Sequence, residues 1–374
     1  MAGPDPAVAA GRLAVRRWLR AHPAPTAEPA STAHPAPTAE PARPPGPAPL
    51  ALVACSGGTD SLALAAAAAF EAPRQGWRLG AAIVDHGLQE ESRAVAARTR
   101  DQCRSLGLDP VEVLAVRVDR DSPAGVEAAA RQARYDALER AARRLGAEAV
   151  WLAHTLDDQA ETVLLALARG AGSKALAGMP EQRGLFARPF LGLTRAQTTA
   201  IVAASGIEPW QDPTNQPDGP YNSARSRVRA HLMPLAREIL GPGFARALAR
   251  TAARLRQDSD YLDAQAARLL LAAAEARTGQ AASGDEGPRL TLDVAELAGA
   301  HPAIRGRALL AGAQAAGASP GGLSAAQVEA LDALVTAWRG QGAVHLAGAI
   351  AAQRKCGKLE FRAFPSSERA PEET

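Results

Sequence analysis

Cysteine is scarce in this sequence. Its three cysteines, Cys55, Cys103 and Cys356, lie far apart, and none belongs to a C-x-x-C pair. This spacing argues against a disulfide framework, a structural zinc site and an iron–sulfur cluster held by thiolates. The scarcity is typical of a cytosolic protein, and we expect a cytoplasmic location.

Long apolar runs are also missing. The N-terminal stretch MAGPDPAVAAGRLAVRRWLRAHP contains no continuous apolar segment of the kind that a secretory signal needs. The apolar run from Leu62 to Phe70 is far shorter than the roughly 20 residues that span a bilayer. We therefore expect no role in a membrane.

Lysine is the third residue in short supply. Lys174, Lys355 and Lys358 are the only lysines among 42 basic residues, so arginine supplies the other 39. The net charge of +3 is small, but segment 221–270 holds nine arginines against four acids. Such a local excess favours either contact with a polyanion or a solvated basic helix.

The chain has 374 residues, which is enough for about two domains. Residues 21–30, AHPAPTAEPA, recur unchanged at 33–42, in a proline-rich stretch too poor in large apolar side chains to fold. We expect a short helix and this disordered repeat in 1–48, a catalytic α/β domain in 49–220, and a basic, mainly helical domain in 221–374. The alternative function of the repeat is a proline-rich ligand for a partner.

Strand and helix patterns alternate from Leu50 onward. Helical crossovers between strands predict a parallel sheet, whose ligands lie beyond the carboxyl ends of its strands. Past Asn222 the pattern is mostly helical, with a capped helix beginning after Ser324 and two short strands within 343–364. The expected strands of the first domain are 50–55, 79–87, 111–118 and 147–154, and its expected helices are 61–70, 91–106, 126–145 and 158–169.

The loop after the first strand, CSGGTDS, has the features of a phosphate site. Gly57 and Gly58 let backbone N–H groups come close, Ser56 and Ser61 offer hydroxyls, and the next helix directs its positive end at an anion. Asp60 would repel phosphates unless a divalent cation lay between them, so it predicts bound Mg²⁺. A P-loop lysine is absent. Alone, the loop would fit an ordinary glycine turn equally well.

SGGTDS resembles the S-G-G-x-D-S loop of the N-type ATP pyrophosphatases, which cleave ATP between its α and β phosphates and adenylate a substrate. The resemblance implies a parallel-sheet, adenine-nucleotide α-hydrolase-like PP-loop domain, followed here by a smaller, mainly helical one. It also implies that ATP contacts Ser56, Gly57, Gly58, Thr59, Asp60 and Ser61.

Two further motifs narrow the family. VDHGLQEES places Asp85 and His86 at a strand end, where an adenosine could bind. It is similar to the D-H-G-L-R segment of tRNA(Ile)-lysidine synthetases, with Gln89 in place of the arginine. The helix AARQARYDAL is similar to their A-R-x-x-R-Y helix. We expect Arg131 to stabilise charge on the reacting phosphorus; the alternatives are a surface histidine and a solvated helix arginine.

The stretch AHTLDDQAETVLLALARGAGSKALAGMP is the most informative. Ala160, Val163, Leu164 and Leu167 form the buried stripe of a helix. His154, Asp158 and Glu161 follow at helical spacing, so they are expected to line one edge that could hold a metal or a substrate amine. The stretch strongly resembles the H-h-x-D-D-Q-A-E-T motif of tRNA(Ile)-lysidine synthetases.

The resemblance continues through residues 188–238. Arg188 and Asp212 lie in their expected order, and the resemblance implies that both contact the lysine or tRNA substrate. RSRVRAHLMPL matches R-N-R-I-R-x-x-L-L-P-L, with Ser226 in place of an asparagine. The resemblance implies that Arg225, Arg227 and Arg229 contact RNA phosphates; a solvated basic helix is the alternative. Near the C-terminus, Ala347–Ala349 stands where the family has P-G-G.

Membership in this family would imply attachment of free L-lysine to C2 of the wobble cytidine of the CAU-anticodon isoleucine tRNA. ATP would adenylate the C2 oxygen and release pyrophosphate, and the lysine ε-amine would displace AMP. The implied catalytic residues are Asp60, Arg131, His154 and Asp158, and Asp158 and Glu161 would receive the ammonium. The sequence is compatible with a homodimer. Two alternatives stay open: another PP-loop enzyme such as a tRNA thiolase, and a non-catalytic adenine-nucleotide-binding module.

Overall fold

The structure is a computed structural model. Most of the proline-rich repeat, Gln89 and Asp212 lie outside the residues that the structure describes. The described residues are 3–23, 48–87, 91–119, 121–122, 125–211, 223–274, 288–319 and 323–364.

The chain divides into two compact units, Met1–Arg254 and Leu255–Thr374. The boundary falls within the helix α10, Phe244–Ala273. The division at 48/49 and 220/221 expected from the sequence stays a prediction. Among the described residues, no helix combines the length and apolar character needed to cross a bilayer.

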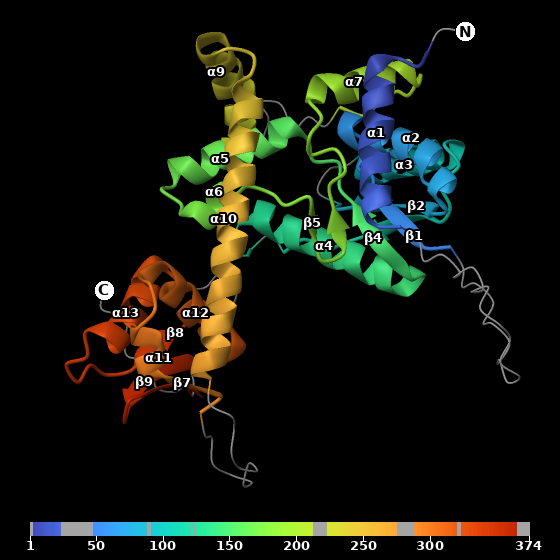
Figure 1. Cartoon of the computed structure of the whole chain (residues 1–374). Helices are drawn as coiled ribbons and strands as arrows, with labels where there is room; N and C mark the ends of the chain where they lie inside the picture. The colour runs from blue at the N-terminus through green and yellow to red at the C-terminus, as the bar shows by residue number, and fades with distance from the viewer. Residues whose placement is uncertain are drawn as a thin grey trace, which may run out of the picture. The chain divides into compact units, whose positions relative to one another are not determined.

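The first unit is built around a six-stranded sheet in the order β3-β2-β1-β4-β6-β5 (Figure 1). Neighbouring strands are parallel except the short pair β5 and β6. Its elements are α1 (Pro6–Ala21), β1 (Leu50–Ala54), α2 (Thr59–Glu71), η1 (Pro73–Gln75), β2 (Arg78–Asp85), α3 (Ser92–Ser105), β3 (Val111–Ala115), α4 (Val126–Leu145), β4 (Ala147–Trp151), α5 (Leu156–Ala168), α6 (Ser173–Leu176), β5 (Gln182–Arg183), β6 (Phe186–Ala187), α7 (Arg195–Ala204), α8 (Ala224–Arg227), η3 (Val228–Leu232) and α9 (Met233–Leu240).

The central strand β1 is buried on both faces, as its continuous apolar sequence predicts. Ala51 and Val53 belong to a core shared with α1, α2, α3 and α7, whereas Leu50 and Leu52 belong to a core shared with α4. Side chains alternate across a strand, so one sheet has a separate core on each face. The parallel α/β prediction is confirmed.

Helix α1 belongs to the first of these cores although it precedes the repeat. Its Trp18 packs edge-on against Trp77 and Trp151, at ring-centroid distances of 5.6 and 5.1 Å. Its Arg16 forms a two-bond ion pair with Glu71 of α2, which is buried. The opening helix therefore covers part of the sheet.

The second unit contains a four-stranded antiparallel sheet in the order β7-β10-β9-β8. The sequence analysis expected two strands within 343–364, and the structure has three there. The expected helix after Ser324 is present, with a capping box between Ser324 and Gln327. The elements are β7 (Leu290–Asp293), α11 (Val294–Ala298), α12 (Pro302–Ala315), α13 (Ala325–Thr336), β8 (Val344–Leu346), β9 (Ile350–Lys355) and β10 (Lys358–Ala363).

The turn between β8 and β9 contains the departure from the family's P-G-G. Ala349 has a φ of 56° there, in the left-handed region, and Gly348 has a φ of 94°. Alanine is strained at such an angle and glycine is not, which gives a physical reason for a second glycine at this position.

Candidate active site

The phosphate loop joins β1 to α2, and its shape is fixed by its own hydrogen bonds. Ser61 Oγ accepts a bond from the Ser56 backbone N–H (3.2 Å) and donates one to the Gly58 carbonyl (2.9 Å). Gly57 has a φ of 80°, and a Cβ there would lie 2.3 Å from Thr99 Oγ1. Only glycine fits beside α3 at this point, so the loop is preformed to receive an anion.

A cavity of about 450 Å³ lies at the carboxyl ends of β1 and β4. It brings the phosphate loop together with the stretch that follows β4, as the parallel-sheet prediction requires. Its lining residues come from five separate segments of the first unit: Ala54, Ser56, Gly58, Thr59, Asp60, Ser61, Arg134, Leu152, Ala153, His154, Asp158, Arg195, Thr199, Trp210, Gln211 and Arg229.

Asp60 extends from the first turn of α2 into this cavity. Its carboxylate accepts a hydrogen bond from the Thr198 hydroxyl, and its Oδ2 lies 3.7 Å from Arg195 Nε. Burial raises the pKa of Asp60, against the opposing effects of Thr198 and Arg195. The carboxylate is therefore partly desolvated and lies beside the phosphate loop, where its oxygens can serve as metal ligands.

The residues around Asp60 fit a magnesium ion shared with phosphates. No group of three or more histidine, cysteine or acidic side chains able to hold a metal occurs among the described residues. Mg²⁺ does not need one, because it commonly uses one or two carboxylates with substrate phosphates and waters. Asp60 can supply that single carboxylate.

The helix α5 begins at Leu156, two residues after His154. Thr155 is its N-cap, and Asp158 Oδ2 accepts bonds from the Thr155 backbone N–H and hydroxyl, both at 2.8 Å. His154 therefore precedes the helix, and the helical spacing assumed between His154 and Asp158 is wrong, although both still line the cavity. Leu167, expected in the buried stripe, is 59% exposed.

Three arginines from later in the chain converge on Asp158 and Glu161. Arg229 donates to Glu161 through Nε (2.9 Å) and Nη2 (3.1 Å), and Nη2 also reaches Asp158 Oδ1 (3.1 Å). Arg195 donates to Asp158 Oδ1 (2.8 Å) and Glu161 Oε1 (3.4 Å). Arg225 Nε lies 3.9 Å from Glu161 Oε2. Burial acts to raise the pKa of Asp158, but Arg195, Thr155 and Arg229 outweigh it and leave that pKa lowered.

These contacts bear on the prediction that the arginines of the basic segment bind RNA phosphates. Arg225 and Arg229 already have acidic partners inside the protein, whereas Arg227 is exposed and has no ion pair among the described residues. A short π-helical segment, Val228–Leu232, carries Arg229. Ser226, which replaces the family's asparagine, is buried and shares a hydrogen bond with the N-cap hydroxyl of Ser223 (2.9 Å). RNA contact by these arginines stays a prediction.

The structure brings Arg134, and not Arg131, into the cavity. Arg131 is exposed, and its guanidinium contacts Tyr135 through a 3.3 Å hydrogen bond and a cation–π distance of 5.0 Å. Arg134 is half-buried, and burial lowers its pKa. Of these two arginines of α4, Arg134 is the one that lines the cavity, and a catalytic role for Arg131 stays a prediction.

His154 lines the cavity as a neutral side chain. Burial, together with the charges of Arg188 and Arg134, lowers its pKa to about 3 despite the opposing charge of Asp158. Its Nδ1 is buried and has no hydrogen-bond partner. The imidazole therefore keeps a free hydrogen-bonding atom and adds no positive charge to the site.

Three further predicted residues, Asp85, His86 and Arg188, are not among the residues that line the cavity. Asp85 Oδ1 accepts a bond from the Gly87 N–H (2.9 Å), and burial lowers the pKa of His86. Arg188 is buried and donates to the Pro180 carbonyl (3.0 Å). Asp212 lies outside the described residues.

Arg195 is the functional candidate that the sequence analysis missed. It opens α7, whose N-cap Thr194 and Gln197 form a capping box, and its backbone N–H donates to Asp157 Oδ2 (2.7 Å). The T-x-x-Q pattern could have located this helix start. No local pattern indicates that its side chain reaches Glu161 and Asp158, 34 and 37 positions earlier in the chain, and Asp60 of the phosphate loop as well.

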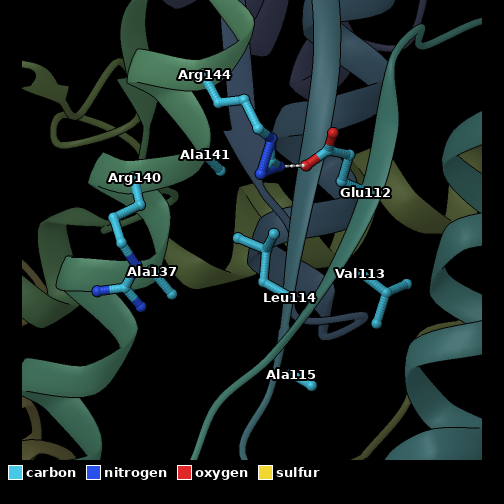
Figure 2. Close-up of a pocket in the computed structure, with 8 residues that line it drawn as sticks. All are labelled: Glu112, Val113, Leu114, Ala115, Ala137, Arg140, Ala141 and Arg144. Atoms are coloured by element: carbon cyan, nitrogen blue, oxygen red, sulfur yellow. Dashed lines mark hydrogen bonds and ion pairs between the residues drawn. The ribbon is translucent and has the colours of Figure 1, made fainter.

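A second hollow of about 460 Å³ lies along the edge strand β3 (Figure 2). Arg144 pairs with Glu112 across it, and Arg140 also lines it. Figure 2 shows these side chains extending from α4 and β3, with alanines between them. None of the predicted site residues lines this hollow.

Comparison with known proteins agrees with this geometry. Residues 40–236 match the family model described as PP-loop domain, and 292–359 match the model described as TilS substrate binding domain. A tRNA(Ile)-lysidine synthase of Salinispora tropica is 51% identical over 79% of this chain and 85% of its own length. That of Thermobifida fusca is 47% identical over 96% of this chain and 98% of its own length.

Among solved structures, the U34-tRNA thiolase NcsA from Methanococcus maripaludis with its 4Fe-4S cluster matches with a TM-score of 0.48 and 16% identity, over 67% of this chain and 79% of that chain. The PP-loop match covers more than half of the chain, and the curated relatives match along most of it. The chain belongs to the tRNA(Ile)-lysidine synthase family of PP-loop ligases.

Proposed function

We propose that this protein ligates L-lysine to C2 of the wobble cytidine of the CAU-anticodon isoleucine tRNA, with ATP released as AMP and pyrophosphate. One observation carries the proposal: the phosphate loop and Asp158 of α5, which shares its arginine partners with Glu161, line a single cavity. A reaction that activates one substrate with ATP and then admits an amine needs both groups within reach of one reacting atom.

In the first half-reaction, the cytidine C2 oxygen attacks the α phosphorus and pyrophosphate leaves. The backbone N–H groups of Gly57 and Gly58 and the hydroxyls of Ser56 and Ser61 bind the phosphates. Arg134 stabilises negative charge at the α phosphorus, a role assigned from the sequence to Arg131. Asp85 and His86, at the end of β2, lie on the adenosine side.

Asp60 would hold Mg²⁺ together with phosphate oxygens. When bound, the ion neutralises charge on the leaving pyrophosphate. Asp60 itself is kept in place by the Thr198 hydroxyl.

In the second half-reaction, the lysine ε-ammonium gives up a proton to solvent, the neutral amine attacks C2, and AMP leaves with the former C2 oxygen. Asp158 and Glu161 attract the incoming ammonium, and the neutral His154 does not repel it. The free Nδ1 of His154 offers a hydrogen bond within the same cavity.

Recognition of the tRNA involves the basic segment and the second unit. The exposed Arg227 contacts a phosphate, and residues 292–359 match a substrate-binding domain. Bacterial tRNA is modified where it is made and used, so we place the enzyme in the cytoplasm.

The test is incubation with ATP, radiolabelled lysine and CAU-anticodon isoleucine tRNA, with elongator methionine tRNA as the control. We expect label in the isoleucine tRNA alone, with AMP released in a lysine-dependent manner. AMP release that needs a sulfur donor would indicate a thiolase instead, and nucleotide binding without AMP would indicate a non-catalytic module.

A further inference from the structure

Arg195 forms contacts that no other described cationic side chain combines. Its Nε faces Asp60 of the phosphate loop at 3.7 Å, and its Nη atoms reach Asp158 at 2.8 Å and Glu161 at 3.4 Å. One guanidinium thus bridges the acid proposed to hold Mg²⁺ and the acids proposed to receive lysine.

The carboxylates that should attract lysine are already occupied by other donors. Asp158 Oδ2 accepts two bonds from Thr155, and its Oδ1 is shared by Arg195 and Arg229. Glu161 is almost fully buried, with Arg229 and Arg195 at Oε1 and Arg229 and Arg225 at Oε2. An ammonium brings three donors and a positive charge, so one of these guanidiniums must leave before lysine can bind.

The contacts indicate which arginine leaves. Arg229 donates two hydrogen bonds to Glu161, at 2.9 and 3.1 Å. Arg225 also donates a hydrogen bond to the Thr162 hydroxyl (3.0 Å). Arg195 makes one short bond to the acids and one longer one. It is also the arginine whose guanidinium already reaches the phosphate loop, where a triphosphate would offer it paired oxygens.

We propose that Arg195 is a positioning residue that makes lysine binding depend on prior nucleotide binding. The guanidinium turns from Asp158 and Glu161 to the ATP phosphates, and the oxygens it leaves receive the ε-ammonium. Its backbone stays anchored, because its N–H is bonded to Asp157 and its helix begins with a capping box. The inference rests on the proposed function.

The experiment titrates L-lysine into the full-length protein by calorimetry, with and without saturating Mg²⁺ and α,β-methylene-ATP. No tRNA is present, so turnover does not enter the measurement. We expect the nucleotide to increase lysine affinity in the wild type at least about fivefold, the lower end of typical coupling between two sites. In Arg195→Gln, lysine should bind without nucleotide as tightly as it binds wild type with nucleotide, and the ratio should fall to about one.

Arg237→Gln is the matched control. Arg237 pairs with Asp157 in the same turn of α5 but does not line the cavity, so its variant should keep the wild-type ratio. Arg195→Lys keeps the charge without the planar fork and should retain part of the ratio.

The outcomes separate the two proposals. Lysine binding by the wild type that is equal with and without nucleotide would overturn the role of Arg195 and leave the proposed function standing. No lysine binding in either condition would remove both. If Arg195→Gln weakens lysine binding and keeps the ratio, Arg195 is structural and the inference fails.

Discussion

The two units use arginine in different ways. In the second unit, the ion pair between Arg305 of α12 and Asp332 of α13 joins one guanidinium to one carboxylate (2.6 and 3.2 Å). In the first unit, three arginines from α7, α8 and η3 converge on two neighbouring acids of one helix beside a cavity.

The difference distinguishes a structural ion pair, which holds two helices together, from a ligand-binding site. A one-to-one pair satisfies both partners and leaves no role for a ligand. Where several cations share a few buried acids, each cation has only part of an acid's hydrogen-bonding capacity. Its contacts can therefore change when an anion or another cation binds. The cavity side of α5 has the second arrangement, and we therefore place the chemistry there.

The largest expected effect comes from the phosphate loop. Asp60→Asn should reduce AMP formation by at least about a thousandfold, because the amide lacks the negative charge with which the carboxylate would bind Mg²⁺ between the phosphates. Asp101→Asn, at an exposed acid paired with its neighbour Arg100, is the control and should keep full activity. AMP formation by Asp60→Asn at a near-normal rate would remove Asp60 from the metal site.

The next prediction separates two arginines of one helix. Arg134→Met should lower kcat/KM by about 10²–10³, as expected for loss of a donor that stabilises transition-state charge. Arg131→Met should lower it less than about fivefold, because Arg131 is exposed and contacts Tyr135. Steady-state AMP release measures both. A larger loss in Arg131→Met would return the catalytic role to Arg131.

Loss of the structural ion pair between Arg305 and Asp332 should affect stability alone. Arg305→Met leaves Asp332 without its two-bond partner, and Arg305 is buried while Asp332 is partly exposed. We expect a loss of about 2 kcal/mol in the free energy of unfolding, below the usual range for a fully buried pair. Denaturant titration measures the loss. At a temperature where the variant is folded, its rate of AMP formation should match that of the wild type. A lower rate would show that the Arg305–Asp332 ion pair also contributes to the reaction.

The smallest effect belongs to the exposed arginine of the basic segment. Arg227→Ala should flatten the dependence of log tRNA affinity on log salt by about 0.7–0.9, the slope of one lost phosphate contact. Arg227→Lys, which keeps the charge, should retain the slope. ATP affinity should be the same in both variants. An unchanged slope in Arg227→Ala would indicate a solvated side chain.

The parallel sheet could be predicted from the sequence because each strand is a short apolar run bounded by turn residues. The strand ends then brought Asp60, His154 and Asp158 together, and the cavity contains all three. The sequence predicts too few strands in the antiparallel sheet, because β8 has only three residues and β9 and β10 are half exposed.

The rest of the site depends on contacts that leave no local pattern. The rotation of α4 decides between Arg131 and Arg134, and it is set by packing of Leu138 and Ala142 against the sheet. Arg195 and Arg229 reach α5 across more than 30 residues of chain, and only the folded structure brings them there.

Asp158 belongs both to the start of a helix and to the wall of the cavity. One oxygen holds the Thr155 cap of α5, and the other faces the arginines. Any substitution here alters the folding of the first turn and the binding of ligand together. Under the proposed function, a substitution that changes amine affinity through this side chain would therefore change the stability of the helix start as well.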